Sequence, residues 1–110
     1  MENNQWLEAI KKALDQKFAQ DITVLDLREL SPSFDYFVLA TAGSQPQMQA
    51  LTQAAEECMK QHGYKLGHVE GLRSGDWVLL DFGVVVVHVF DRDSRQFYNL
   101  ERVWGDAKIV

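Results

Sequence analysis

Three histidines and one cysteine are the side chains of this sequence best suited to bind a metal or act as a nucleophile. The histidines, His62, His68 and His88, fall at a predicted helix end, in a predicted loop and in a predicted strand, without the short spacing of metal-ligand motifs. Cys58 is the single cysteine, which rules out an intrachain disulfide and a cysteine-based zinc cluster. No histidine stands at a spacing that marks a Cys-His dyad. The sequence therefore predicts no metal site, no catalytic residue and no cofactor.

The tripeptide Asp81-Phe82-Gly83 has the sequence of the metal-binding triplet of protein kinases. A chain of 110 residues is too short for a kinase, and this one lacks the Gly-rich loop and the catalytic-loop motif that accompany the triplet. We interpret these residues as the turn of a β-hairpin, because strand-forming residues flank them on both sides.

Gly43-Ser44 lies between a predicted strand and a predicted helix, where nucleotidyltransferases hold a nucleotide phosphate at a helix N-terminus. Two-metal phosphoryl transfer also needs closely placed carboxylates. No Asp-x-Asp follows Gly43-Ser44 at short range, and Asp91 and Asp93 arrive only after the predicted hairpin. A cryptic or vestigial nucleotidyltransferase that uses Ser44 with Asp91 and Asp93 is therefore the alternative function, not the preferred one.

The charge balance of the chain bears on its partners. Eleven Lys and Arg against sixteen Asp and Glu give a net charge of -5, so long-range electrostatics repel phosphate and favour a basic protein. We expect no dominant direct nucleic-acid binding. The sequence has no run of 18 apolar residues, and its start resembles neither a secretory signal nor a transit peptide. These features predict no membrane span and a cytoplasmic location.

Local patterns predict a mixed α/β fold in a single domain over residues 1–110, with the order helix, strand, strand, helix, hairpin, helix. Residues 22–27 predict a strand that is either covered on both faces or interrupted by a bulge. Residues 35–41 contain an uninterrupted aromatic and aliphatic run from Tyr36 to Ala40 and predict a central strand. The first helix has Asn3 and Asn4 as N-cap candidates and an apolar face made of Leu7, Ile10, Leu14 and Phe18.

The second predicted helix begins at a capping box of Ser44 and Gln47, carries Pro46 in its first turn and ends near His62, before Gly63. Its 3.6-residue periodicity predicts a buried face of Met48, Leu51, Ala55, Cys58 and Met59.

Two further segments complete the predicted fold. Residues 64–74 contain glycines and mixed charges and predict an irregular connection. Beyond Asp91, the spacing of Phe97, Leu100 and Trp104 predicts a C-terminal helix, with Ser94 or Asp93 near its cap.

The hairpin over residues 77–90 separates two kinds of side chain. Pairing centred on Phe82-Gly83 predicts that Asp81 lies opposite Val84, Leu79 opposite Val86 and Trp77 opposite His88, all on one mixed face. The other face is aliphatic and must be core, with Val78, Leu80, Val85, Val87 and Val89. A mixed aromatic and polar face is typical of a partner-binding surface. Alternatively, Trp77 and His88 belong to a second core layer under the C-terminal helix.

The chain resembles the Iojap/RsfS ribosomal silencing factors, in their bacterial form, through an ordered set of motifs. These are DYFVLATAGS, the Glu70-Gly71 pair, WVLLDFG, VVVHVF and FYNLERVWGDA, which extend from about Asp21 to Ala107. The resemblance implies a fold related to nucleotidyltransferases but without their activity. It also implies a partner, the large-subunit ribosomal protein uL-fourteen, and repression of translation by blocking subunit joining when nutrients are scarce. Val84 and residues 45–47 depart from the family pattern.

The resemblance favours the partner-binding interpretation of the mixed hairpin face. We predict that Trp77 and Leu79 are apolar anchors and that Asp81 pairs with a basic residue of the partner. Val86 and His88 share the same face, with His88 as a polar neighbour, and Tyr98 extends the patch. A homodimer that pairs this face with itself in the absence of ribosomes is an open alternative, because the same kind of surface suits either use.

Overall fold

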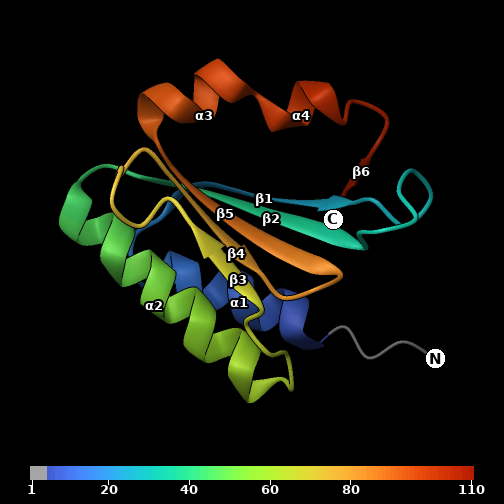
Figure 1. Ribbon diagram of the computed structural model, residues 1–110, viewed down its shortest axis with the longest axis horizontal. Coiled ribbons are helices and arrows are strands. Elements are labelled where there is room, and N and C mark those ends of the chain that lie inside the picture. Colours follow the sequence, from blue (N-terminus) through green and yellow to red (C-terminus); the bar gives the residue numbers. More distant parts are fainter. Residues whose placement is uncertain (1–4) are drawn as a thin grey trace.

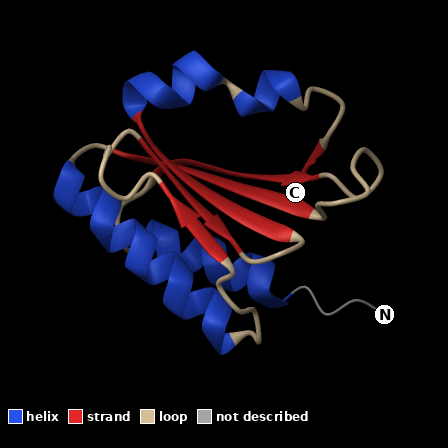
Figure 2. Cartoon of the chain, in the orientation of Figure 1, coloured by secondary structure: helices blue, strands red, loops and turns tan. Residues whose placement is uncertain are grey.

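A six-stranded mixed sheet organises the protein in the computed structural model, which describes residues 5–110 (Figures 1 and 2). The strand order across the sheet is β3-β4-β5-β2-β1-β6. The strands are β1 (Gln20–Asp26), β2 (Tyr36–Ala42), β3 (His68–Glu70), β4 (Trp77–Asp81), β5 (Val85–Asp91) and β6 (Lys108–Ile109). The mixed α/β fold predicted from the sequence is confirmed, while the N-cap candidates Asn3 and Asn4 lie outside the described residues.

Helices cover both faces of the sheet. In Figure 1, α1 (Gln5–Asp15) and α2 (Gln45–Gln61) lie side by side below it, whereas α3 (Arg92–Tyr98) and α4 (Leu100–Val103) cross above it. The predicted buried face of α2 is confirmed, since its five members are at most 7% exposed. Within the described residues, no helix is both long and apolar enough to span a membrane.

The two central strands are β2 and β5, which pair in parallel from Tyr36 opposite Val85 to Ala42 opposite Asp91. Every residue of β2 is buried, as expected for a strand that has neighbours on both sides and helices on both faces. The predicted central position of this strand is confirmed. On its other side, β1 pairs with β2 in antiparallel orientation with a register shift between Gln20 and Thr23, so the bulge predicted as one option is present.

The first helix is shorter than its apolar spacing predicted. It ends at Asp15, and Phe18 lies beyond it with φ 66° and 81% of its surface exposed. The prediction that Phe18 belongs to the buried face is therefore wrong, because the chain leaves the helix before this position and its left-handed backbone turns the ring outward. The amide of Gln47 bonds the carbonyls of Lys17 and Phe18, which ties this helix end to the start of α2.

The start of α2 has the predicted cap with one difference. The Ser44 hydroxyl accepts a hydrogen bond from the Gln47 backbone N–H at 3.2 Å. The Gln47 side chain bonds back to the N–H of Gly43 at 2.6 Å, one residue before the position expected in a capping box. Gln45 donates to the Gly75 carbonyl. Two of the residues at 45–47, where the chain departs from the family pattern, therefore form hydrogen bonds that hold the start of α2 in place.

The connection over residues 64–74 is not wholly irregular, because it contains the edge strand β3. This strand has only three residues, too few for period-two alternation to be detected in the sequence. It is followed by Gly71, whose φ is 85°. A Cβ atom there would lie 1.8 Å from the carbonyl oxygen of Trp77, so the Glu70-Gly71 pair marks a close approach of two backbones.

The predicted single C-terminal helix is two short helices. Asn99 adopts a left-handed conformation with φ 44° that ends α3 and caps α4. The N-cap of α3 is Asp91, whose carboxylate accepts from the Ser94 N–H at 2.8 Å, so Asp93 and Ser94 lie near the cap, in the first turn of the helix. The break separates the three apolar residues of the predicted helix: Phe97 is 81% exposed, while Leu100 and Trp104 pack against the core.

Candidate functional site

The hairpin formed by β4 and β5 has a different register from the predicted one. Asp81 pairs with Val86, Leu79 with His88, and Trp77 with Phe90. The turn is centred on Gly83-Val84, where Gly83 has φ 94°, the positive value favoured at the first central position of a type II′ turn. The shift is by two residues, so the side chains keep their faces. The aliphatic face is core, as predicted, and packs against α1 and α2.

The mixed face of the hairpin lies under the C-terminal helices and forms part of what we call the second core. Its buried members are Leu25, Leu27, Phe37, Leu39, Val86 and Phe90, with Trp77, Leu79, Leu100 and Trp104 among the partly buried residues packed against them. Val86 and His88 are only 3% and 2% exposed. These two predicted contact residues therefore lie in a second core layer, which a partner does not reach while α3 and α4 stay in place. Trp77, Leu79 and Asp81 are partly exposed.

Trp77 lies within a set of contacting rings. Its ring is 4.9 Å from Phe90 at an interplanar angle of 30°, and 4.6 Å from Tyr98 of α3. The indole Nε1–H donates to His88 Nδ1 at 3.0 Å. Tyr98 is 45% exposed and contacts the highly exposed Phe97 at 5.1 Å. The aromatic surface therefore continues from β4 onto α3.

The environment of His88 keeps its imidazole neutral. Desolvation by burial lowers its pKa from 6.5 to about 3. Since Nδ1 accepts the indole hydrogen bond, the single proton of the neutral ring lies on Nε2. Among the described residues Nε2 has no hydrogen-bond partner. His88 is therefore not a pH switch near neutrality. Its polar role is to accept, at Nδ1, the hydrogen bond from the Trp77 indole.

Asp81 stands at the end of β4 beside the hairpin turn. One carboxylate oxygen accepts from the Gly83 N–H at 2.8 Å, which fixes the side chain against the turn. In the described part of the chain Asp81 forms no ion pair. The carboxylate is thus oriented by the backbone and free to pair with a cation from outside the chain.

Phe97 and Arg95 are the two residues that matter for this face and that sequence reasoning missed. The apolar spacing groups Phe97 with Leu100 and Trp104, although Asn99, a residue that tolerates left-handed backbone, signals that the helix can break there. Arg95 is 8% exposed and donates to Thr41 at 3.0 Å, to Thr23 at 3.1 Å and to Glu101 at 2.9 Å. A charged residue in a short helix carries no sequence signal of burial.

The contacts of Arg95 fasten α3 and α4 to the sheet. Burial alone would raise the pKa of Glu101, but the hydrogen bonds and positive charge of Arg95 outweigh this and hold the pKa below its usual value. Glu101 is therefore ionised at neutral pH and completes an ion pair with Arg95. This pair, together with the two threonine hydroxyls, keeps the helices above the second core.

The residues of the alternative nucleotide site do come together. Gly43, Ser44, Asp91 and Asp93 line a hollow of about 370 Å³ at the carboxyl ends of β2 and β5. The Ser44 hydroxyl and the Asp91 carboxylate are engaged in capping α2 and α3. Across residues 5–110, no group of three or more His, Cys, Asp or Glu side chains is arranged to hold a metal ion. Titration of the purified protein with a nucleotide and Mg²⁺ tests this alternative directly.

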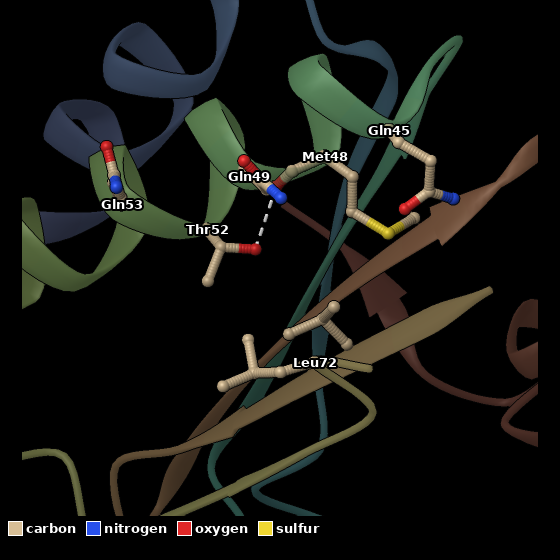
Figure 3. Close-up of a pocket in the computed structure, with 7 residues that line it drawn as sticks. Gln45, Met48, Gln49, Thr52, Gln53 and Leu72 are labelled. Atoms are coloured by element: carbon tan, nitrogen blue, oxygen red, sulfur yellow. Dashed lines mark hydrogen bonds between the residues drawn. The ribbon is translucent and has the colours of Figure 1, made fainter. Parts of the chain in front are cut away.

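A smaller cavity of about 150 Å³ lies between α2 and the segment that joins β3 to β4 (Figure 3). Its lining is Gln45, Met48, Gln49, Thr52, Gln53, Leu72 and Val78. The Thr52 hydroxyl donates to the Met48 carbonyl at 2.8 Å, the dashed line of Figure 3. None of the lining side chains is titratable, so the cavity offers no general acid or base.

Comparisons with known proteins agree with the architecture. The family model for "Ribosomal silencing factor during starvation" matches residues 1–110. The chain is 38% identical to ribosomal silencing factor RsfS of Bacillus subtilis over 100% of this chain and 93% of that protein. It is 38% identical to chloroplastic Iojap of Arabidopsis thaliana over 92% of this chain and 42% of that protein. A crystal structure of a Chromobacterium violaceum protein has a TM-score of 0.86 at 35% identity, covering 96% of this chain and 88% of that chain.

The six-stranded sheet, with two helices on each face, defines a mixed α/β protein of the same architecture as that crystal structure. The chain belongs to the ribosomal silencing factor family, which confirms the resemblance found in its motifs. Membership supports a ribosome-associated role in silencing translation, and the names of the relatives point to a regulator that is not an enzyme.

Proposed function

We propose that this protein represses translation during nutrient limitation by binding the large ribosomal subunit through protein uL-fourteen and blocking its joining to the small subunit. The observation that carries the proposal is the partly exposed row of Trp77, Leu79 and Asp81 on β4, which continues onto Tyr98. Apolar anchors beside an acidic group suit a basic protein partner. Because the chain belongs to the ribosomal silencing factor family, its expected partner is the ribosome. A cytoplasmic location follows from such a partner.

The six predicted contact residues take two different roles in this proposal. Trp77, Leu79, Asp81 and Tyr98 touch the partner, and Phe97 widens the patch because it is exposed and contacts Tyr98. Val86 and His88 are buried and support the row from below. The proposal needs no catalytic step, since occupation of the subunit face is itself the block.

The first expected result concerns subunit preference. In a sucrose gradient, the purified protein sediments with isolated large subunits and stays at the top of the gradient with small subunits. In a reconstituted translation system, adding it lowers the yield of joined ribosomes. Equal association with both subunits, or unchanged joining at saturating protein, contradicts the proposal. A homodimer in free solution, measured by sedimentation equilibrium, is compatible with it only if large subunits dissociate the dimer.

A second expected result concerns salt. The chain has a net charge of -5 and Asp81 has no cation within the described residues, so attraction to a basic partner contributes to affinity. Exposed charges are screened beyond a Debye length of about 10 Å at 0.1 M salt. We expect the dissociation constant for large subunits to rise steadily as KCl increases, and Asp81→Asn to flatten this dependence. A dissociation constant that does not change over the same range of KCl concentration shows that charge attraction does not contribute to binding.

A further inference from the structure

The orientation of the Trp77 indole depends on the hydrogen bond that its Nε1–H donates. The ring is partly exposed, with Phe90 and Tyr98 in contact at 4.9 Å and 4.6 Å. These apolar contacts alone do not fix the direction of the Nε1–H. That group donates to His88 Nδ1 at 3.0 Å, a bond across neighbouring strands that selects one orientation of the ring.

His88 is held rigidly at its side of this bond. Its ring is 4.6 Å from Phe37 in an edge-on arrangement and nearly parallel to Phe90, at an interplanar angle of 9°. The side chain is 2% exposed, so it cannot turn without displacing its neighbours in the second core. The acceptor that it offers to the indole is therefore fixed in space.

A histidine is an unfavourable choice for this position if packing is its only purpose. The other interior positions of β5 nearest to it are valines, and Nε2 of His88 has no hydrogen-bond partner among the described residues. A buried donor without an acceptor destabilises the folded state, and an aliphatic side chain would remove this penalty. Among the described residues, the bond that Nδ1 accepts from Trp77 is the polar interaction of the side chain that an aliphatic residue would lose.

We propose that His88 is a positioning residue for partner recognition, which holds the Trp77 indole in its binding orientation without touching the partner itself. This inference rests on the proposed function, because it assumes that Trp77 contacts the ribosomal partner. A side chain that is already immobilised loses less conformational freedom on binding, so the hydrogen bond raises affinity rather than fold stability.

The test compares His88→Leu with His88→Asn. Leucine fills the space without an acceptor, whereas the Oδ1 atom of asparagine occupies a place close to that of Nδ1. We expect His88→Leu to keep the melting temperature of the parent and to weaken binding to isolated large subunits about tenfold. We expect His88→Asn to bind nearly as tightly as the parent. His62→Leu, on the α2 side of the sheet, is the matched control and leaves affinity unchanged.

A spectroscopic measurement separates positioning from a merely structural role. The Trp77 Nε1–H resonance, assigned with Trp77→Phe, is expected to shift and to exchange faster with water in His88→Leu, and to stay near its parent position in His88→Asn. The inference is overturned if His88→Leu fails to fold while His88→Asn folds, or if His88→Leu loses the indole bond yet binds as tightly as the parent. Parent-like binding by Trp77→Ala instead contradicts the proposed face itself.

Discussion

Replacing Arg95 with alanine is expected to lower the free energy of unfolding by about 3 kcal/mol, the low end for breaking a buried ion pair. The guanidinium is 8% exposed and bonds Thr41, Thr23 and Glu101, so its removal takes a partner from one buried hydroxyl, one partly buried hydroxyl and a carboxylate. Glu101 is 36% exposed, and water solvates part of the charge left behind, which keeps the loss at the low end. Urea denaturation followed by circular dichroism measures the change.

Arg92→Ala is the matched control for this experiment. Arg92 lies on the same helix, is exposed, and makes one side-chain hydrogen bond, to Gln20 at 3.2 Å. We expect its replacement to change stability by no more than about 0.5 kcal/mol, as exposed polar contacts usually do. Similar losses for both variants, or no loss for Arg95→Ala, would show that the Arg95 contacts do not fasten α3 and α4 to the sheet.

The two faces of the hairpin could be predicted although its register could not. Strand side chains alternate with a period of two, so a register shift of two residues leaves every side chain on its own face. The turn position depends on tertiary packing: Phe82 is 6% exposed in the core against α1 and α2, which pulls it out of the turn. Gly83-Val84 becomes the turn instead, and the exposed Val84, a departure from the family pattern, is tolerated there.

Helix ends explain why two aromatic residues that continue an apolar helical spacing are exposed. Phe18 and Phe97 both continue a helical spacing of apolar residues, and both lie at or beyond the last turn of a helix that ends early. The period of 3.6 residues says nothing about the residue at which a helix stops. Left-handed backbone at Phe18 and at Asn99 marks those ends, and this conformation is uncommon for residues other than glycine.

The sequence predicts which residues share the candidate face, but not how deeply each of them is buried. Motifs and strand alternation put Trp77, Leu79 and Asp81 on one face, and the structure keeps them together. Whether a face is covered depends on the chain that crosses it, and two short helices held by Arg95 cover Val86 and His88. No local pattern in residues 92–104 indicates that these helices lie over the sheet rather than beside it.

Replacing Trp77 with alanine is expected to weaken binding to large ribosomal subunits by about 2 kcal/mol or more, which is the usual cost of truncating a central aromatic anchor. The change also removes contacts with Phe90 and Tyr98. A fully buried tryptophan would cost roughly 3–5 kcal/mol of folding stability, and the partly exposed Trp77 should cost less. Both quantities are therefore measured on the same variant, with thermal unfolding first and affinity at a temperature where the variant is folded.

Trp104→Ala is the comparison that separates anchor from core. Trp104 is also partly buried in the second core, with its ring 5.8 Å from Phe37, but it lies after α4 and outside the row of Trp77, Leu79 and Asp81. We expect the two alanine variants to lose similar stability and only Trp77→Ala to lose affinity. If Trp77→Ala binds like the parent whenever it is folded, Trp77 belongs to the second core alone, because its ring then contributes packing and no contact with the partner.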